Sequence, residues 1–191
     1  MNNIKKNQPE KNEEELEIIE YGLEALYLTF TKIIIILLVS MVLDIFKETL
    51  LMIFFYNVIR LFAFGLHAKN STTCLITSLV LFIVGTYLAI YIDIPIELKF
   101  ILSITCIILI IIYAPADTEK RPLINAKKRK RFKILSTITS LIITFLIIYF
   151  NDKYISNFML IGMIESTIMI LPITYKLYGL PYNNYKNYSN I

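Results

Sequence analysis

The two residues best suited to chemistry are His67 and Cys74, which lie in the stretch RLFAFGLHAKNSTTC between two hydrophobic segments. His67 is the only histidine of the chain, and Cys74 is one of its two cysteines. A thiol whose proton passes to an imidazole becomes a strong nucleophile, and the imidazolium can later protonate a leaving amine. The pattern therefore favours a cysteine nucleophile with a histidine base. The alternative is a small apolar cysteine that fills space beside a merely hydrogen-bonded histidine.

The spacing of this pair requires a break in the backbone. On a straight helix, residues seven apart return to nearly the same face but lie about 10 Å apart along the axis. Gly65 permits a turn, and both Asn70 and Ser71 are typical helix N-cap residues. If either of them caps the next helix, Cys74 falls in its first turn, where unpaired N–H groups and the helix dipole favour a thiolate.

Other polar residues near or within the apolar segments are candidates for supporting roles. Arg60 either clamps a substrate carboxylate or carbonyl, or pairs with Glu48 or reaches the lipid headgroups. Lys69 would add positive charge beside the thiolate. Glu165 lies in an apolar segment, so we expect a functional or inter-helix polar contact, with Lys32 and Arg60 as candidate partners.

Neither the second cysteine nor the set of possible metal ligands predicts a further site. Cys106 stands in the apolar run FILSITCIILIII and is predicted to be a packing residue. One histidine and one cysteine cannot supply the three or four ligands of an ordinary metal site, so no metal and no cofactor is expected.

The composition predicts an all-α, polytopic integral membrane protein made of one domain, residues 1–191. The chain is 57% hydrophobic, and its apolar residues occur in long blocks. Two stretches, at about 25–43 and 49–64, contain polar residues and either span the bilayer or dip into one leaflet. Four further stretches are predicted to span the membrane: about 75–92, 100–114, 134–150 and 154–173.

The charges of the loops predict the orientation in the cell membrane. Segment 114–133 holds eight Lys or Arg against one Asp and one Glu, which places this loop in the cytoplasm. Tracing the spans from there puts Cys74 at the cytoplasmic face and both termini in the cytoplasm. Residues 1–22 form a polar, amphipathic N-terminal segment that does not resemble a cleavable signal peptide, and residues 174–191 form a tail.

A run of five basic residues within that loop is first of all a topology signal and a binder of anionic lipid. It could also hold an acidic peptide at the membrane surface. It lacks the interleaved aromatic residues of a nucleic-acid surface, so nucleic acid is not an expected partner. The run comprises Lys127, Lys128, Arg129, Lys130 and Arg131.

Two motifs, in this order and at this distance, resemble the accessory gene regulator B (AgrB) family. The second motif is YAPADTEKRPL, Tyr113 to Leu123, which is followed by the basic run. The similarity in layout covers nearly the whole chain. The first motif consists of Arg60, Gly65, His67, Ala68, Lys69, Ser71 and Cys74.

The resemblance implies a membrane cysteine endopeptidase of a Gram-positive quorum-sensing system. Such a protein would remove the C-terminal tail of an AgrD-like propeptide and promote its closure to a thiolactone or lactone pheromone. Cys74 would be the nucleophile and His67 its base. Arg60, Gly65, Lys69 and Ser71 would support the site, the basic run would engage the substrate, and the protein would act as a homodimer.

Two rival functions remain open at the level of sequence. A non-catalytic peptide transporter would use Glu165, Lys32 and Arg60 as polar contacts within the membrane. A membrane scaffold would give Cys74 no more reactivity towards thiol reagents than Cys106.

Overall fold

The structure, a computed structural model, describes residues 13–66, 70–119, 122–150 and 152–188, without the side chains of residues 13–26, 28 and 188. Within these ranges the chain is helical and forms no strand, and one isolated parallel bridge pairs Phe64 with Ala116. The predicted all-α class is therefore confirmed. The elements in chain order are α2 (Glu13–Val42), α3 (Phe46–Ala63), α4 (Ser71–Leu79), the π-helical turn η1 (Val80–Val84), α5 (Gly85–Tyr91), α6 (Ile96–Tyr113), α7 (Ala126–Phe150), α8 (Lys153–Ile168), α9 (Pro172–Leu177) and the 3-10 turn η2 (Asn184–Tyr188).

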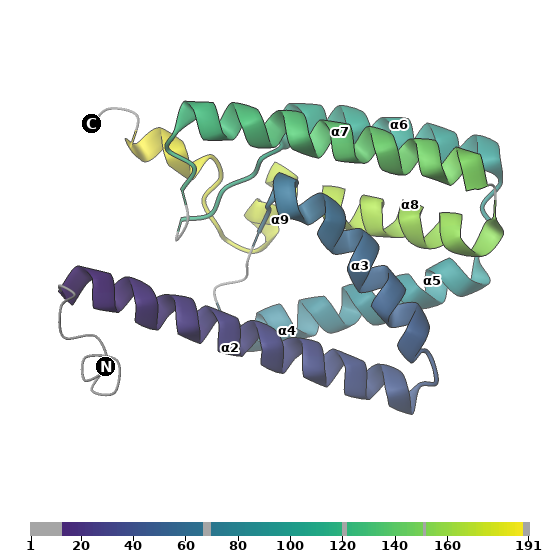
Figure 1. The fold of residues 1–191 in the computed structure, drawn as a ribbon, viewed down its shortest axis with the longest axis horizontal. Helices are drawn as coiled ribbons and strands as arrows, with labels where there is room; N and C mark the ends of the chain where they lie inside the picture. Colours follow the sequence, from purple (N-terminus) through teal and green to yellow (C-terminus); the bar gives the residue numbers. More distant parts are fainter. Residues whose placement is uncertain (1–12, 67–69, 120–121, 151, 189–191) are drawn as a thin grey trace.

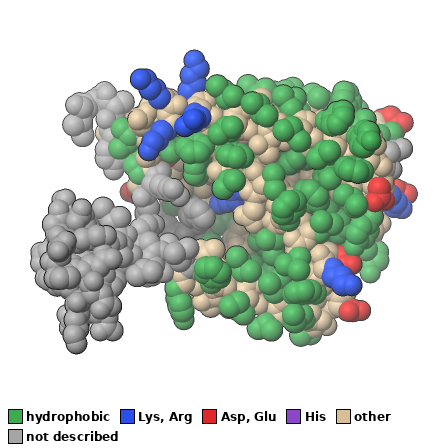
Figure 2. Space-filling model, in the orientation of Figure 1, with side chains coloured by type: hydrophobic (Ala, Val, Ile, Leu, Met, Phe, Trp, Pro, Cys, Tyr) green, Lys and Arg blue, Asp and Glu red, His purple; other side chains and the backbone are tan. Residues whose placement is uncertain are grey.

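Three helical stretches of the described chain are long and apolar enough to cross a bilayer. They are Ser71–Tyr91, which runs through α4, η1 and α5, then α6 (Ile96–Tyr113) and α7 (Ala126–Phe150). Hydrophobic side chains cover much of the visible surface between the two ends of the molecule (Figure 2). These features confirm a polytopic membrane protein.

Helices α3 and α8 form the centre of the bundle (Figure 1). Almost every residue of α8 from Ser156 to Thr167 is buried, and Ser166 donates a hydrogen bond of 2.8 Å to the carbonyl of Tyr56 on α3. Gly162 makes this close packing possible, because a Cβ there would lie 3.0 Å from the backbone nitrogen of Tyr56.

The predicted span at 154–173 is a shorter helix in the structure and lies inside the bundle. Helix α8 ends at Ile168, and the chain turns before α9 begins at Pro172. An apolar sequence of this kind suits protein contacts as well as lipid contacts, so its hydropathy did not distinguish the two. The stretches 25–43 and 49–64 belong to continuous helices, α2 and α3, and neither helix breaks at Lys32 or Arg60.

The connections alternate between the two ends of the bundle, as the loop charges predicted. The starts of α2, α4 and α7 lie at the same end as α9 and η2, and we call this the Cys74 end (Figure 1). The α5–α6 and α7–α8 turns lie at the opposite end, where Lys153 and Asp93 form an ion pair of 2.8 Å. Several basic side chains gather at the Cys74 end, whereas acidic and basic side chains lie side by side at the opposite end (Figure 2).

Candidate active site

Cys74 lies in the first turn of α4, as the sequence predicted. Asn70 is the N-cap residue, with an extended backbone (φ −105°, ψ 141°), and its carbonyl accepts the Cys74 N–H at 3.0 Å. Ser71 is the first helical residue and is exposed. The Cys74 side chain is half-buried, so its thiol is accessible without being surrounded by water.

The Cys74 side chain lines a cavity of about 160 Å³ between α2, α3, α4 and the segment after α9. Two cations, Lys32 and Arg60, share this cavity with the thiol, and none of its described lining residues is acidic. A small, partly apolar cavity with two positive groups suits a peptide carbonyl or a developing negative charge. Its remaining lining residues are Thr29, Ile33, Ile36, Ile53, Tyr56, Asn57, Leu66, Thr77, Ser78, Leu81, Phe82, Met169 and Tyr178.

The Arg60 guanidinium has one fixed bond and one free donor nitrogen. Nη2 donates to the carbonyl of Leu66, and the guanidinium carbon lies 5.3 Å from the centre of the Tyr56 ring. Nη1 is buried and has no acceptor among the described residues. Arg60 does not pair with Glu48, which instead accepts the hydroxyl of Tyr154 at 2.8 Å. A buried donor without an acceptor is costly, so Nη1 retains the capacity for one more hydrogen bond.

Gly65 is required both by its conformation and by its neighbours. Its φ of +118° is rare for residues with a side chain, and a Cβ would lie 2.9 Å from the Met169 carbonyl oxygen and 3.2 Å from Nη1 of Arg60. Its N–H donates to Ala116 at 3.0 Å, while the N–H of Leu66 donates to Met169 at 3.1 Å. Gly65 therefore lets the backbone pass close beside the guanidinium.

Tyr178 is a site residue that the sequence analysis missed. Its hydroxyl lies 2.7 Å from that of Thr77, one turn after Cys74, and both residues line the cavity. Because Thr77 donates its own hydrogen to the carbonyl of Thr73 at 2.8 Å, Tyr178 is the donor of the pair. The two residues are 101 positions apart, and no local pattern could have linked them.

The remaining predicted residues have diverse locations. His67 and Lys69 fall outside the described residues. Glu165 is buried on α8 with its carboxyl against Gly85, and no ion pair or hydrogen bond of the described chain joins it to Lys32 or Arg60. Among the described residues, no three His, Cys, Asp or Glu side chains cluster in a way that could hold a metal ion.

The basic run occupies the first two turns of α7, at the Cys74 end. Most of its side chains are exposed. Arg129 differs, because its guanidinium carbon lies 3.8 Å from the centre of the Tyr185 ring and its Nη1 donates to Leu123. Arg129 therefore binds the C-terminal segment, while its neighbours Lys127, Lys128, Lys130 and Arg131 remain available at the surface.

Comparison with known proteins identifies the family. The family model for accessory gene regulator B matches residues 1–170. A putative AgrB-like protein of Clostridium acetobutylicum is 34% identical over 171 residues, covering 90% of this chain and 82% of its own length. A putative AgrB-like protein of Listeria innocua is 30% identical over 187 residues, covering 97% and 91% of the two chains.

A relative from Staphylococcus aureus (strain bovine RF122 / ET3-1) is called accessory gene regulator protein B. It is 37% identical over 155 residues, which are 81% of this chain and 82% of that protein. No solved structure matches the chain. Taken with the two motifs and the helical membrane fold, these similarities show that the chain belongs to the accessory gene regulator B (AgrB) family of quorum-sensing proteins.

Proposed function

We propose that this protein is a membrane cysteine endopeptidase that cleaves the C-terminal tail from an AgrD-like propeptide and promotes closure of the remaining peptide to a thiolactone or lactone. One observation carries the proposal. Cys74, in the first turn of a helix, lines a small cavity together with Arg60, whose buried Nη1 has no acceptor among the described residues. Nucleophile and donor are the two groups that acyl transfer requires together.

The proposed reaction runs through a thioester. His67, seven residues before Cys74, takes the thiol proton; the sulfur attacks the scissile carbonyl, and the Arg60 guanidinium stabilises the oxygen as it becomes negative. Collapse of the tetrahedral intermediate breaks the C–N bond, and the imidazolium returns its proton to the leaving amine. A thiol or hydroxyl within the peptide then displaces Cys74, which closes the ring and regenerates the thiol.

The competing reaction at the thioester is hydrolysis, which would release a linear acid. The cavity is small and lined in part by aliphatic and aromatic side chains such as Ile36, Leu81 and Phe82. Restricting water there favours attack by the tethered peptide nucleophile over attack by solvent. This supports transfer of the acyl group to the nucleophile of the peptide itself, and not to water, at the proposed peptidase site.

The exposed side chains of the basic run, Lys127, Lys128, Lys130 and Arg131, would engage acidic parts of the propeptide and anionic headgroups. We assign the Cys74 end to the cytoplasm because the basic loop lies there. The start of α2 and the turn η2 lie at the same end, which supports two cytoplasmic termini. A homodimer remains part of the proposal; the exposed apolar residues of α2, such as Phe30, Ile34 and Leu38, would face lipid or a second copy.

The decisive experiment is mass spectrometry of the purified protein after incubation with its cognate propeptide. We expect a covalent peptide adduct on Cys74, present in Cys106→Ala and absent in Cys74→Ala. His67→Ala should greatly slow adduct formation. A transporter would still deliver a peptide that is cut elsewhere when Cys74 is replaced, and a scaffold would form no adduct at all. Either result would refute the proposal.

A further inference from the structure

The sequence motif YAPADTEKRPL has no role in the reaction described above, yet it contains a buried acid. Asp117 is 4% exposed, and its carboxylate accepts three backbone N–H groups. Oδ1 accepts from Asn184 at 2.9 Å, while Oδ2 accepts from Tyr185 at 2.8 Å and from Leu123 at 3.2 Å. The acid therefore holds its own loop and the C-terminal segment together.

A second bond strengthens the same connection. The Tyr175 hydroxyl donates to the backbone carbonyl of Asp117 at 2.9 Å, and Tyr175 is almost fully buried. Burial raises the pKa of Tyr175, so its hydroxyl stays protonated and able to donate. The position of the Asp117 peptide is thus fixed from α9 as well as from η2.

The residue before Asp117 pairs with the backbone beside Arg60. Ala116 donates its N–H to Ala63 at 3.0 Å and accepts the N–H of Gly65 at 3.0 Å, which forms the parallel bridge between Phe64 and Ala116. Leu66, next in the chain, supplies the carbonyl that binds Nη2 of Arg60. A continuous series of bonds therefore leads from the Asp117 carboxylate to the guanidinium in the Cys74 cavity.

We propose that Asp117 is a positioning residue of the active site: by fixing Ala116, it fixes Gly65 and Leu66, and so holds the Arg60 guanidinium in its place beside the cavity that Cys74 lines. The inference rests on the proposed function. It assigns the C-terminal segment a role in building the site, because Asn184 and Tyr185 supply two of the three N–H donors that hold the carboxylate.

Asp117→Asn is the sharpest change, because it keeps the size and removes the charge. Oδ2 accepts two N–H groups, so an amide nitrogen at that position would set a donor against two donors. If the amide turns the other way, the same conflict arises with the N–H of Asn184. The loop should therefore loosen, and the guanidinium should lose its fixed acceptor.

The test measures the electric field at Cys74 without requiring turnover. In full-length protein carrying Cys106→Ala, Cys74 is alkylated by iodoacetate, which is anionic, and by iodoacetamide, which is neutral. A guanidinium held in the cavity speeds the anionic reagent selectively, so Arg60→Gln should lower the iodoacetate-to-iodoacetamide rate ratio by about three- to tenfold. Asp117→Asn should lower the ratio nearly as far, and adding it to Arg60→Gln should lower it no further.

The controls separate positioning from general damage. Asp93→Asn removes an exposed carboxylate at the opposite end and should leave the ratio at its wild-type value. Should Asp117→Asn fail to fold, Tyr175→Phe removes a single bond to the same peptide and should lower the ratio in the same direction by a smaller amount. With propeptide, Asp117→Asn should reduce kcat and leave KM near the wild-type value, since the cation that it positions acts on the oxyanion.

The outcomes are distinct from those that test the peptidase proposal. An unchanged ratio in folded Asp117→Asn, or an unchanged ratio in Arg60→Gln, overturns the positioning role even if Cys74 forms the acyl-enzyme. Independent, multiplicative effects of the two substitutions also overturn it. Failure of Cys74 to form an adduct would end the peptidase proposal, whereas the alkylation ratio would still report whether Asp117 positions Arg60.

Discussion

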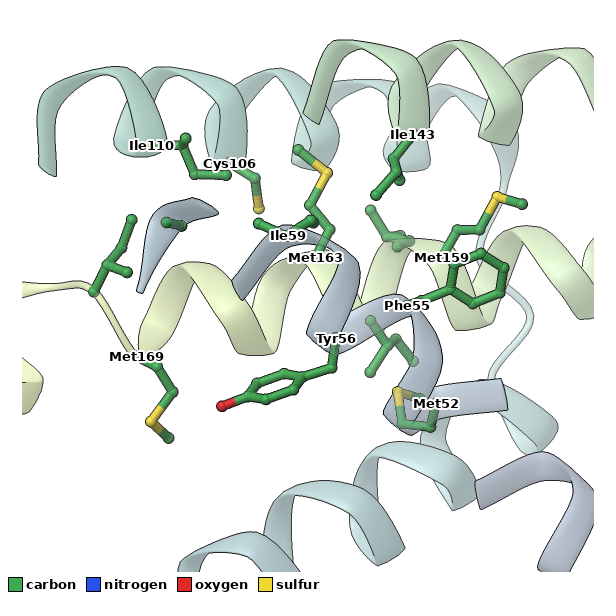
Figure 3. Packing of buried hydrophobic residues seen from close by; sticks show 14 of the residues in the cluster. Met52, Phe55, Tyr56, Ile59, Cys106, Ile110, Ile143, Met159, Met163 and Met169 are labelled. Carbon is green, nitrogen blue, oxygen red and sulfur yellow. The ribbon is translucent and has the colours of Figure 1, made fainter. Parts of the chain in front are cut away.

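The two cysteines lie in different surroundings, and the contrast shows which surroundings allow a thiol to react. Cys74 is half-buried in the first turn of α4 and opens into a cavity with two cations. Cys106 is 5% exposed on α6 and packs among core side chains such as Ile59 and Met163 (Figure 3). Cys74 follows a polar, helix-starting stretch and Cys106 stands in an apolar run, and the structure adds the differences in access and in neighbouring charge.

The largest expected effect tests the difference between the two cysteines directly. Cys74→Ala should abolish propeptide cleavage, a loss of at least about 10³-fold in kcat/KM, because no other group can form the thioester. Cys106→Ala should keep cleavage within about threefold and lower the free energy of unfolding by about 1 kcal/mol, since it removes only a small buried group. Quantitative mass spectrometry of the released tail measures both. Comparable losses in the two variants would mean that the thiol at position 74 has no special role.

A second prediction compares a glycine in close contact with the site with a glycine that has open space around it. Gly65 and Gly179 both have positive φ, +118° and +61°, but a Cβ at Gly179 would meet nothing within 4 Å. Gly65→Ala should reduce kcat by about 10- to 100-fold, because it displaces the Arg60 guanidinium or the Met169 carbonyl. Gly179→Ala should cost only the backbone strain, about 1 to 2 kcal/mol of stability, with little change in kcat.

Cleavage assays at matched protein concentration, with thermal unfolding in detergent, separate these two effects. If Gly179→Ala proves as harmful to kcat as Gly65→Ala, backbone strain alone is responsible and the close contact of Gly65 with Arg60 is irrelevant.

A third prediction sharpens the picture of the surface at the Cys74 end. Replacing Lys127, Lys128, Lys130 and Arg131 together by Gln should raise KM for the propeptide by about three- to tenfold at low salt, and the difference should shrink at high salt. Arg129→Gln should instead lower stability, because Arg129 contacts Tyr185 and Leu123. A salt-independent effect of the four-residue variant would contradict an electrostatic role.

The smallest expected effect tests whether the core is chemically silent. Glu165 packs against Gly85 where the π-helical turn η1 meets α5, and its Oε2 is buried with no partner among the described residues. Glu165→Gln should therefore change the cleavage rate by less than about twofold and stability by less than about 1 kcal/mol. A large loss of cleavage in a folded variant would bring Glu165 into the mechanism and weaken the division between the two regions.

Local patterns predicted the helices and the location of Cys74 well. Asn70 and Ser71 marked the start of α4 because polar N-cap types stand just before an apolar run. The bundle also alternates from end to end as the loop charges implied, since positive residues resist crossing the bilayer. Arg60 was a predicted site residue, and it lines the Cys74 cavity.

The residues that complete the cavity could not be predicted in the same way. Lys32 was considered only as a partner for Glu165 or a polar contact of a transporter, and Tyr178 was missed, yet both line the cavity. Their contacts join α2, α4 and the C-terminal segment across long sequence separations. A hydropathy pattern shows how apolar a segment is, but it does not show which segments contact one another.

By itself, the sequence determined the helical class, the membrane setting and the placement of a cysteine in the first turn of a helix. Each of these depends on local composition, periodicity and charge, which act over a few residues. Only the tertiary structure decided that α8 lies inside the bundle, that Arg60 lines the Cys74 cavity, and that Asp117 joins the loop to the C-terminal segment. The physical reason is that apolar helices can face lipid or protein at similar cost, so close contacts such as that of Gly162 with Tyr56 select the packing.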